Sequence, residues 1–446
     1  MKRRNGIGKG MICVLALGVW ILAGMMPVAS ASAQSPGVSV DIFGPGQGQL
    51  NLVVLSPRGL DGGTPPDLAA VFEEAVQQNL NFLPFVQMVA VDSLLGGDPS
   101  TGVRIEEIDL KPLRLAKVDL VVTMGWEDNN LQARVYDTLN GRRLVGKAYP
   151  ELDRPKTPLA ADAFCAAFMK ALTGRNGFFN SDLAYVGKVS EGREIFVVSP
   201  QGRERRQLTK LGGINLSPAW DNNGDRIVFT HVGEKSHSLG IVDRATGKTR
   251  MRSFPGYTVI GPDFLPNGDM AVTLSIKGRP DIYRLNRAFQ VQETLAASHS
   301  IDVSPSFDQK GIRMAFVSDR RGNPHIFLKE MLTGQVRRVT HDGKYNTSPC
   351  MSPDGRYVAF SRQVEGRHRI FVHDLMTGQE RQITFGPGND EEPAFGPDGY
   401  FIAFSSSRSG TYQIYLTTRH ADQPKLVPTG SGEATAPAWD TSRIQY

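Results

Sequence analysis

A short string that returns at a nearly constant interval constrains the fold of this chain more than any other feature. A proline opens each copy, and neighbouring copies are 43 or 44 residues apart: Pro218, Pro262, Pro305, Pro349, Pro393 and Pro437. Turn glycines and apolar positions, such as Gly355 and Phe360, keep the same interval. Each copy contains four short apolar segments bounded by Gly, Pro, Asp and Asn, which is typical of strands and turns. A period of about 40–45 residues with four strands per unit indicates a β-propeller.

The two ends of this array are complementary. The first copy begins at residue 183 without its proline-containing strand, and the last copy stops soon after Pro437 and Trp439. We therefore predict that residues 437–440 pair in the same blade as residues 183–186, which leaves no open sheet edge. The predicted fold is an all-β, six-bladed β-propeller over residues 183–446. One copy, residues 261–274, is irregular and has Thr273 in place of an aromatic residue, which we interpret as structural drift.

Residues 50–174 do not repeat and predict a small α/β domain. Residues 50–55 and 118–122 are apolar enough for buried strands, and residues 131–137 and 142–148 flank an Asn140-Gly141 hairpin turn. One helix is expected to start with Thr64 as its N-cap and Pro65 as its first residue. A second helix is expected over residues 158–172, ended by Gly174. Residues 175–182 then form a linker to the propeller.

The first 33 residues have the pattern of a secretory signal peptide. Basic residues precede an apolar run over residues 11–28, and a small-residue cleavage sequence ends at Ala33. Cleavage after Ala33 predicts a protein that is exported across the inner membrane. The formal net charge of +5 includes four basic and no acidic residues of this segment, so the remainder carries only +1. We therefore expect no nucleic-acid partner.

Residues 34–49 form a Gly/Pro-rich arm that contains one β-prone patch. This patch comprises Val38, Val40, Asp41, Ile42 and Phe43. A short strand inside flexible sequence can pair with the sheet edge of a partner. We expect it to do so, or to fold back onto this protein when no partner is bound.

Few residues suggest catalysis. The chain has no G-x-S-x-G, H-E-x-x-H, P-loop or C-x-x-C motif, and its eight histidines are scattered. Cys165 and Cys350 lie in different predicted domains, so two buried free thiols are expected. We predict a protein that is not an enzyme and has no cofactor. Two alternatives stay open: a Ca²⁺ ion in the propeller channel, and a periplasmic propeller hydrolase or lyase acting on carbohydrate or peptide.

The residues just before each repeat proline lead into the innermost strands, so they must surround one end of the channel. The predicted protein-binding residues at this mouth are Ile301, Asp302, Val303, Tyr345, Asn346, Thr347, Asp390, Glu391, Glu433 and Thr435. Loops on a rigid ring that supply an aromatic residue and several acids suit a protein partner with a basic or amide-rich surface.

The repeat sequence over residues 304–340 resembles the repeats of the TolB family, and so does the order of signal peptide, arm, α/β domain and propeller. This resemblance implies a non-enzymatic periplasmic scaffold of the Tol–Pal system, which supports outer-membrane integrity and cell division. It implies that the lipoprotein Pal binds the propeller mouth, that TolA binds the arm, and that the protein is a monomer, peripheral to membranes. Residues 110–122 and 261–274 depart from the family pattern.

Overall fold

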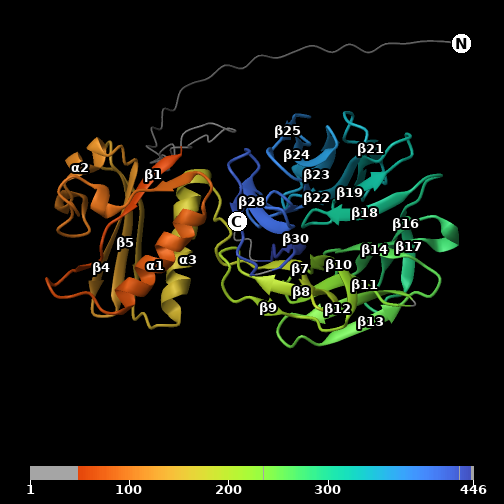
Figure 1. Ribbon diagram of the computed structural model, residues 1–446, viewed down its shortest axis with the longest axis horizontal. Helices are drawn as coiled ribbons and strands as arrows, with labels where there is room; N and C mark the ends of the chain where they lie inside the picture. The colour runs from red at the N-terminus through yellow and green to blue at the C-terminus, as the bar shows by residue number, and fades with distance from the viewer. Residues whose placement is uncertain (1–48, 235, 431, 443–446) are drawn as a thin grey trace, which may run out of the picture. The chain divides into compact units, whose positions relative to one another are not determined.

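The computed structural model describes residues 49–234, 236–430 and 432–442 (Figure 1). The predicted signal peptide and the arm patch at residues 38–43 lie outside the described residues. The described part begins with an α/β domain and continues into a propeller. No helix in these residues is both long enough and apolar enough to cross a membrane.

A mixed sheet with the strand order β3-β1-β4-β5-β6 forms the centre of the α/β domain. Its strands are β1 (Leu50–Val54), β2 (Arg58–Gly59), β3 (Val86–Met88), β4 (Leu120–Glu127), β5 (Asn130–Asp137) and β6 (Arg143–Tyr149). β1 runs parallel to β3 and β4, whereas β4, β5 and β6 are antiparallel neighbours. The short β2 pairs with the end of β4.

Successive side chains of a strand point to opposite faces of a sheet, and here apolar side chains point to both. Each face of this sheet therefore packs against other elements. Leu52 and Val54 face a core shared with α1 (Leu68–Phe82) and α3 (Lys156–Thr173). Val53 and Leu55 face the other side, where α2 (Leu110–Leu115) and the 3₁₀ turns Val91–Ser93 and Ile105–Glu107 lie. Figure 1 shows α1 and α3 side by side on one face of the sheet.

The predicted elements of this domain are largely present, with two corrections. The hairpin around Gly141 is confirmed, and Gly174 ends α3 in a left-handed conformation at φ 76°. Helix α1 begins at Leu68, so Thr64 as its N-cap was wrong: Pro65 precedes another proline, and a residue before proline avoids the helical region. α3 begins at Lys156, two residues before the predicted start, because Pro158 is tolerated in the first turn.

The propeller has six four-stranded blades. The first combines β30 (Ala434–Trp439) with β7 (Leu183–Val189), β8 (Gly192–Val198) and β9 (Arg206–Gln207). The second contains β10 (Gly213–Trp220), β11 (Arg226–Val232), β12 (His237–Asp243) and β13 (Thr249–Ser253); the third contains β14 (Val259–Phe264), β15 (Met270–Leu274), β16 (Asp281–Leu285) and β17 (Val291–Ala296). The fourth contains β18 (Asp302–Phe307), β19 (Arg313–Ser318), β20 (His325–Glu330) and β21 (Val336–Arg338). The fifth contains β22 (Asn346–Met351), β23 (Tyr357–Val364), β24 (Arg367–Asp374) and β25 (Glu380–Gln382); the sixth contains β26 (Asp390–Phe395), β27 (Phe401–Ser406), β28 (Gln413–Thr418) and β29 (Lys425–Leu426).

The predicted pairing of the last strand of the chain with the first blade is confirmed. β30 is antiparallel to β7, with Ala438 opposite Ala184 and Trp439 opposite Leu183 (Figure 1). Trp439 is 5% exposed, and its Nε1 donates a hydrogen bond to Ser181 Oγ at 2.7 Å. The last strand of the chain is therefore the innermost strand of the first blade.

The recurring proline marks a β-bulge in every inner strand. The residue before each proline has a positive φ of 49–56°: Ser217, Gly261, Ser304, Ser348, Glu392 and Ala436. Strand register shifts at each of these places. The bulge directs backbone N–H groups to the neighbouring blade: Ser304 donates to Thr273 Oγ1 at 3.2 Å, and Glu392 donates to Ser361 Oγ at 3.2 Å. The repeat therefore encodes blade-to-blade contacts as well as a turn.

In the fourth, fifth and sixth blades an arginine lies over two neighbouring aromatic rings. In the fifth blade the guanidinium of Arg362 lies 5.2 Å from the ring centre of Phe360 and 4.4 Å from that of Phe371. The second blade has Gly240 at the position of the third-strand aromatic. A Cβ there would lie 2.3 Å from Phe229 and 2.8 Å from the sulfur of Met251, so these two side chains fill the space.

The α/β domain and the propeller share a continuous core. Phe178, inside the predicted linker, lies 4.5 Å from Phe401 and 5.5 Å from Trp439 between ring centres. Arg175 donates to the backbone carbonyl of Asp398 at 2.8 Å and pairs with Asp354 at 3.0 Å. The linker is therefore a packed segment of the structure.

Candidate functional site

The central channel contains a cavity of about 260 Å³ lined by the bulged inner strands of all six blades. We call the end at which these strands begin the mouth and the opposite end the turn end. At the turn end, Asn222 donates to the carbonyl of Gln309 at 3.2 Å, and Gln309 donates to that of Thr441 at 3.3 Å. Arg175 also contacts turns at this end. The mouth is therefore the end away from the α/β contacts.

Three predicted mouth residues are buried inside the blades, which corrects their predicted role. Asp302, Asn346 and Asp390 are each 0% exposed. Asp302 pairs with Arg320 at 2.6 Å, and Asn346 accepts a hydrogen bond from Arg362 at 2.7 Å. Arg320 and Arg362 also lie over the aromatic ring pairs of the fourth and fifth blades, so the acid or amide links the inner strand to these rings. The side chains of the three predicted residues are therefore engaged in contacts within the protein.

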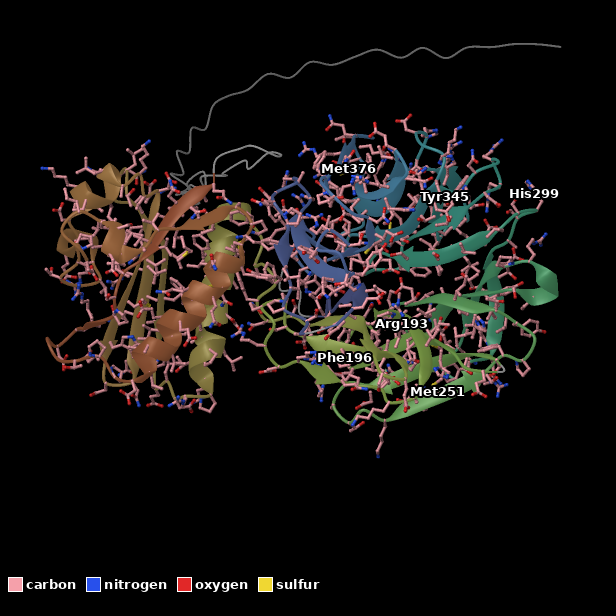
Figure 2. All side chains as sticks on the ribbon, viewed as in Figure 1. Arg193, Phe196, Met251, His299, Tyr345 and Met376 are labelled. Carbon is pink, nitrogen blue, oxygen red and sulfur yellow. The ribbon has the colours of Figure 1, made fainter. Side chains whose placement is uncertain are left out.

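The other seven predicted residues retain access to solvent at the mouth. Ile301 and Tyr345 are each 43% exposed. The remaining five are partly exposed: Val303, Thr347, Glu391, Glu433 and Thr435. Figure 2 labels Tyr345 and Arg193, the ion-pair partner of Glu433, which lie on different blades.

Four side chains make a connected cluster where the fifth and sixth blades meet at the mouth. The rings of His368 and Tyr345 are T-shaped to each other, with 5.9 Å between ring centres, and His368 Nε2 is 3.7 Å from Glu391. The hydroxyl of Tyr412 donates to the same Glu391 carboxylate. Burial and this hydrogen bond raise the pKa of Tyr412 to about 12, so it remains a donor at neutral pH. Glu391 is therefore already engaged within the protein.

The first blade presents a self-paired polar sector. Arg193 lies 2.7 Å from the carboxylate of Glu433 and donates to Thr435 Oγ1 at 3.3 Å. Sequence reasoning missed Arg193, His368 and Tyr412, since they reach the mouth from strands or loops other than the proline-containing segments. It also missed the exposed Ile214, although Ile214 stands four residues before its proline, as Ile301 and Tyr345 do.

The channel wall offers little catalytic chemistry. Its ionisable lining residues are Asp263, Asp308, Cys350 and Glu392, and no histidine is among the described lining residues. Cys350 is only half-buried, which corrects the prediction of a second core thiol, and burial raises its pKa to about 12. A thiol with a raised pKa is a poor nucleophile. Cys165 is buried as predicted.

The described residues contain no group of three or more His, Cys, Asp or Glu side chains arranged as a metal site. The carboxylates of the channel accept protein hydrogen bonds instead. Asp263 accepts from the backbone N–H groups of Phe264 and Phe307, each at 2.9 Å, and Glu392 accepts from that of Ala436 at 2.8 Å. Ca²⁺ usually takes six to eight oxygen ligands. The alternative of a channel Ca²⁺ ion stays a prediction.

Asp263 should make propeller stability depend on pH. Burial raises its pKa to about 7, so the folded state holds a proton that the unfolded state releases above about pH 4. This contribution to stability is present at low pH and is lost as pH rises to about 7. Asp263→Ser copies Ser306, which occupies the same position in the next blade and accepts the N–H of Met351 at 3.0 Å.

We compare the melting temperature of Asp263→Ser with that of the unmodified chain at pH 5 and at pH 8. The difference, variant minus unmodified chain, should be at least about 4 °C larger at pH 8, since about 1 kcal/mol shifts the melting temperature of a domain of this size by 2–4 °C. Differential scanning calorimetry measures this difference. Asp225→Ser, at an exposed carboxyl, is the control and should show no such change. If the melting temperatures of all three proteins changed with pH in the same way, Asp263 would not titrate as described.

The fold and the mouth define a class: six-bladed propeller proteins with an attached α/β domain and an exposed ring surface at one channel end. The family model described as the TolB beta propeller domain matches residues 169–443. The chain is 46% identical over 308 residues to the Tol-Pal system protein TolB of Nitratidesulfovibrio vulgaris, across 68% of this chain and 70% of that protein. It is 30% identical over 295 residues to the protein TolB homolog of Chlorobium luteolum, across 66% and 67%. The chain belongs to the TolB family.

A solved structure shares the fold. The crystal structure of TolB from Acinetobacter baumannii aligns with a TM-score of 0.74 at 22% identity, covering 89% of this chain and 98% of that one. The predicted β-propeller preceded by a small α/β domain is thus confirmed.

Proposed function

We propose that this protein is a non-enzymatic periplasmic component of the Tol–Pal system, which binds the lipoprotein Pal at the propeller mouth and thereby supports outer-membrane integrity and cell division. The observation that carries the proposal is the exposed ring of side chains at the mouth, held on six rigid blades. Family membership supports the choice of partner. The raised pKa of the channel thiol, and the lack of a histidine among the lining residues that the structure describes, argue against a hydrolase or lyase.

The test of Pal binding is a double substitution at the rim. Tyr345→Ala removes the exposed ring beside His368, and Glu391→Lys removes the acceptor of the Tyr412 hydroxyl. We expect Pal to bind this variant at least about tenfold more weakly, which corresponds to about 1.4 kcal/mol. Isothermal titration calorimetry with the soluble Pal domain of the same organism measures it, and circular dichroism establishes that the variant is folded. Unchanged affinity in a folded variant would place Pal on another surface.

The arm is proposed to bind TolA through the β-prone patch at residues 38–43. Deletion of residues 35–46 should abolish TolA binding, and the melting temperature should change by less than about 2 °C, because the deleted residues precede the first strand of the sheet. A pull-down with the soluble part of TolA, alongside a thermal melt, measures both. Retained TolA binding would assign that contact to the folded part of the chain.

A further inference from the structure

Exposed apolar side chains are distributed unevenly around the mouth. Six segments lead from the outer strand of one blade into the inner strand of the next. In five of these regions a large apolar side chain is exposed to solvent: Ile214 (42% exposed), Tyr257 (40%), Ile301 (43%), Tyr345 (43%) and Phe385 (48%). We call these five residues the apolar arc. Ile214 lies at the start of β10, and the other four precede the inner strands of the third to sixth blades.

The remaining segment leads into β30 and has a different character. Its described residues include no exposed large apolar side chain, and its Glu433 is paired with Arg193 at 2.7 Å. Glu391, the other predicted acid of the rim, accepts from Tyr412 and lies 3.7 Å from His368. Both carboxylates therefore have partners within the protein. Partners of this kind reduce the gain from a further ionic contact, and rim-exposed ion pairs contribute little to affinity.

Resting on the proposed function, we infer that Pal is held mainly by an apolar surface that packs on the apolar arc, and that it leaves the Arg193–Glu433 sector of the first blade uncontacted. Aromatic and branched aliphatic side chains at the centre of a docking surface supply most of its binding energy. Tyr257, Tyr345 and Phe385 are such aromatic anchors. The surface of Pal that docks here is therefore expected to be apolar, and not a basic surface attracted by acids of the rim.

The experiment compares two double variants by calorimetry with the soluble Pal domain. Ile301→Ala with Tyr345→Ala removes two neighbouring members of the apolar arc, and we expect at least about 30-fold weaker binding. Arg193→Ala with Glu433→Ala removes the polar pair together, so that no unpaired charge remains, and we expect less than about threefold weakening. Raising NaCl from 50 to 500 mM should weaken binding of the unmodified chain less than about threefold, since screening acts on charge contacts.

A matched control comes from the fourth blade, to which Ile301 also belongs. Ile312 and Leu332 are 50% and 96% exposed but lie in turns at the opposite end, so Ile312→Ala with Leu332→Ala should leave Pal affinity unchanged. A large loss in the Arg193/Glu433 variant with little loss in the Ile301/Tyr345 variant would overturn the inference while leaving Pal as the partner. If Pal did not bind even the unmodified chain, the proposed function itself would fail.

Discussion

A chain that ends at Gly430 should lose its propeller. This truncation removes β30, the innermost strand of the first blade, and exposes the edge of β7 with which it pairs. It also removes Trp439, which is 5% exposed and lies against Phe178. Loss of a buried tryptophan alone costs about 3–5 kcal/mol, against a typical domain stability of about 5–15 kcal/mol. Circular dichroism on heating should show an early or absent cooperative transition.

The control for this truncation is a chain that ends at Ser442. It keeps Trp439 and the backbone hydrogen bond from Asp440 to Asp182, so its transition should lie within about 2 °C of that of the full chain. If the Gly430 chain melted like the Ser442 chain, β30 would not be required to close the ring.

Asp390→Ala should destabilise the propeller far more than substitution of its neighbour. The Asp390 carboxylate is 0% exposed, pairs with Arg408 at 2.9 Å and Arg369 at 3.3 Å, and accepts a hydrogen bond from Ser406 at 2.6 Å. Its removal leaves two largely buried guanidinium groups without their carboxylate. Breaking a buried ion pair in this way costs about 3–5 kcal/mol.

Glu391→Ala is the matched control, since Glu391 is the next residue and its side chain is 30% exposed. We expect its free energy of unfolding to change by less than about 1 kcal/mol. Urea denaturation followed by tryptophan fluorescence measures both variants. Equal losses at the two positions would contradict the division between a structural Asp390 and an accessible Glu391.

The number of blades and the pairing of the last strand with the first blade could be predicted because the repeat is long and regular. The first copy also lacks the strand that the end of the last copy supplies. The individual roles of the mouth residues could not. Side chains alternate between two environments along a strand, which puts Ile301 outside and Asp302 inside. An aspartate is normally expected outside, and only its contact with Arg320 explains its burial. That arginine comes from the connection between β19 and β20, and no sequence spacing identifies the pairing.

The other contacts at the mouth join residues that are far apart in the sequence. Arg193 and Glu433 are 240 residues apart in the sequence, and Tyr412 reaches Glu391 from the connection between β27 and β28. The proline repeat predicts where the inner strands lie in the sequence. It does not predict which loops contact them at the mouth. The apolar arc is different: three of its members occupy the same repeat position, so comparison of the copies could have identified them.

Site-specific photocrosslinking in growing cells tests the central claim most directly. Tyr345 and Met376 both belong to the fifth blade (Figure 2), and both are exposed, at 43% and 77%, but Tyr345 stands at the mouth and Met376 in a turn at the opposite end. Each is replaced in turn by p-benzoylphenylalanine, and crosslinked products are identified by mass spectrometry. We predict a crosslink to Pal from position 345 and none from position 376. A Pal crosslink from position 376 with none from position 345 would contradict the account.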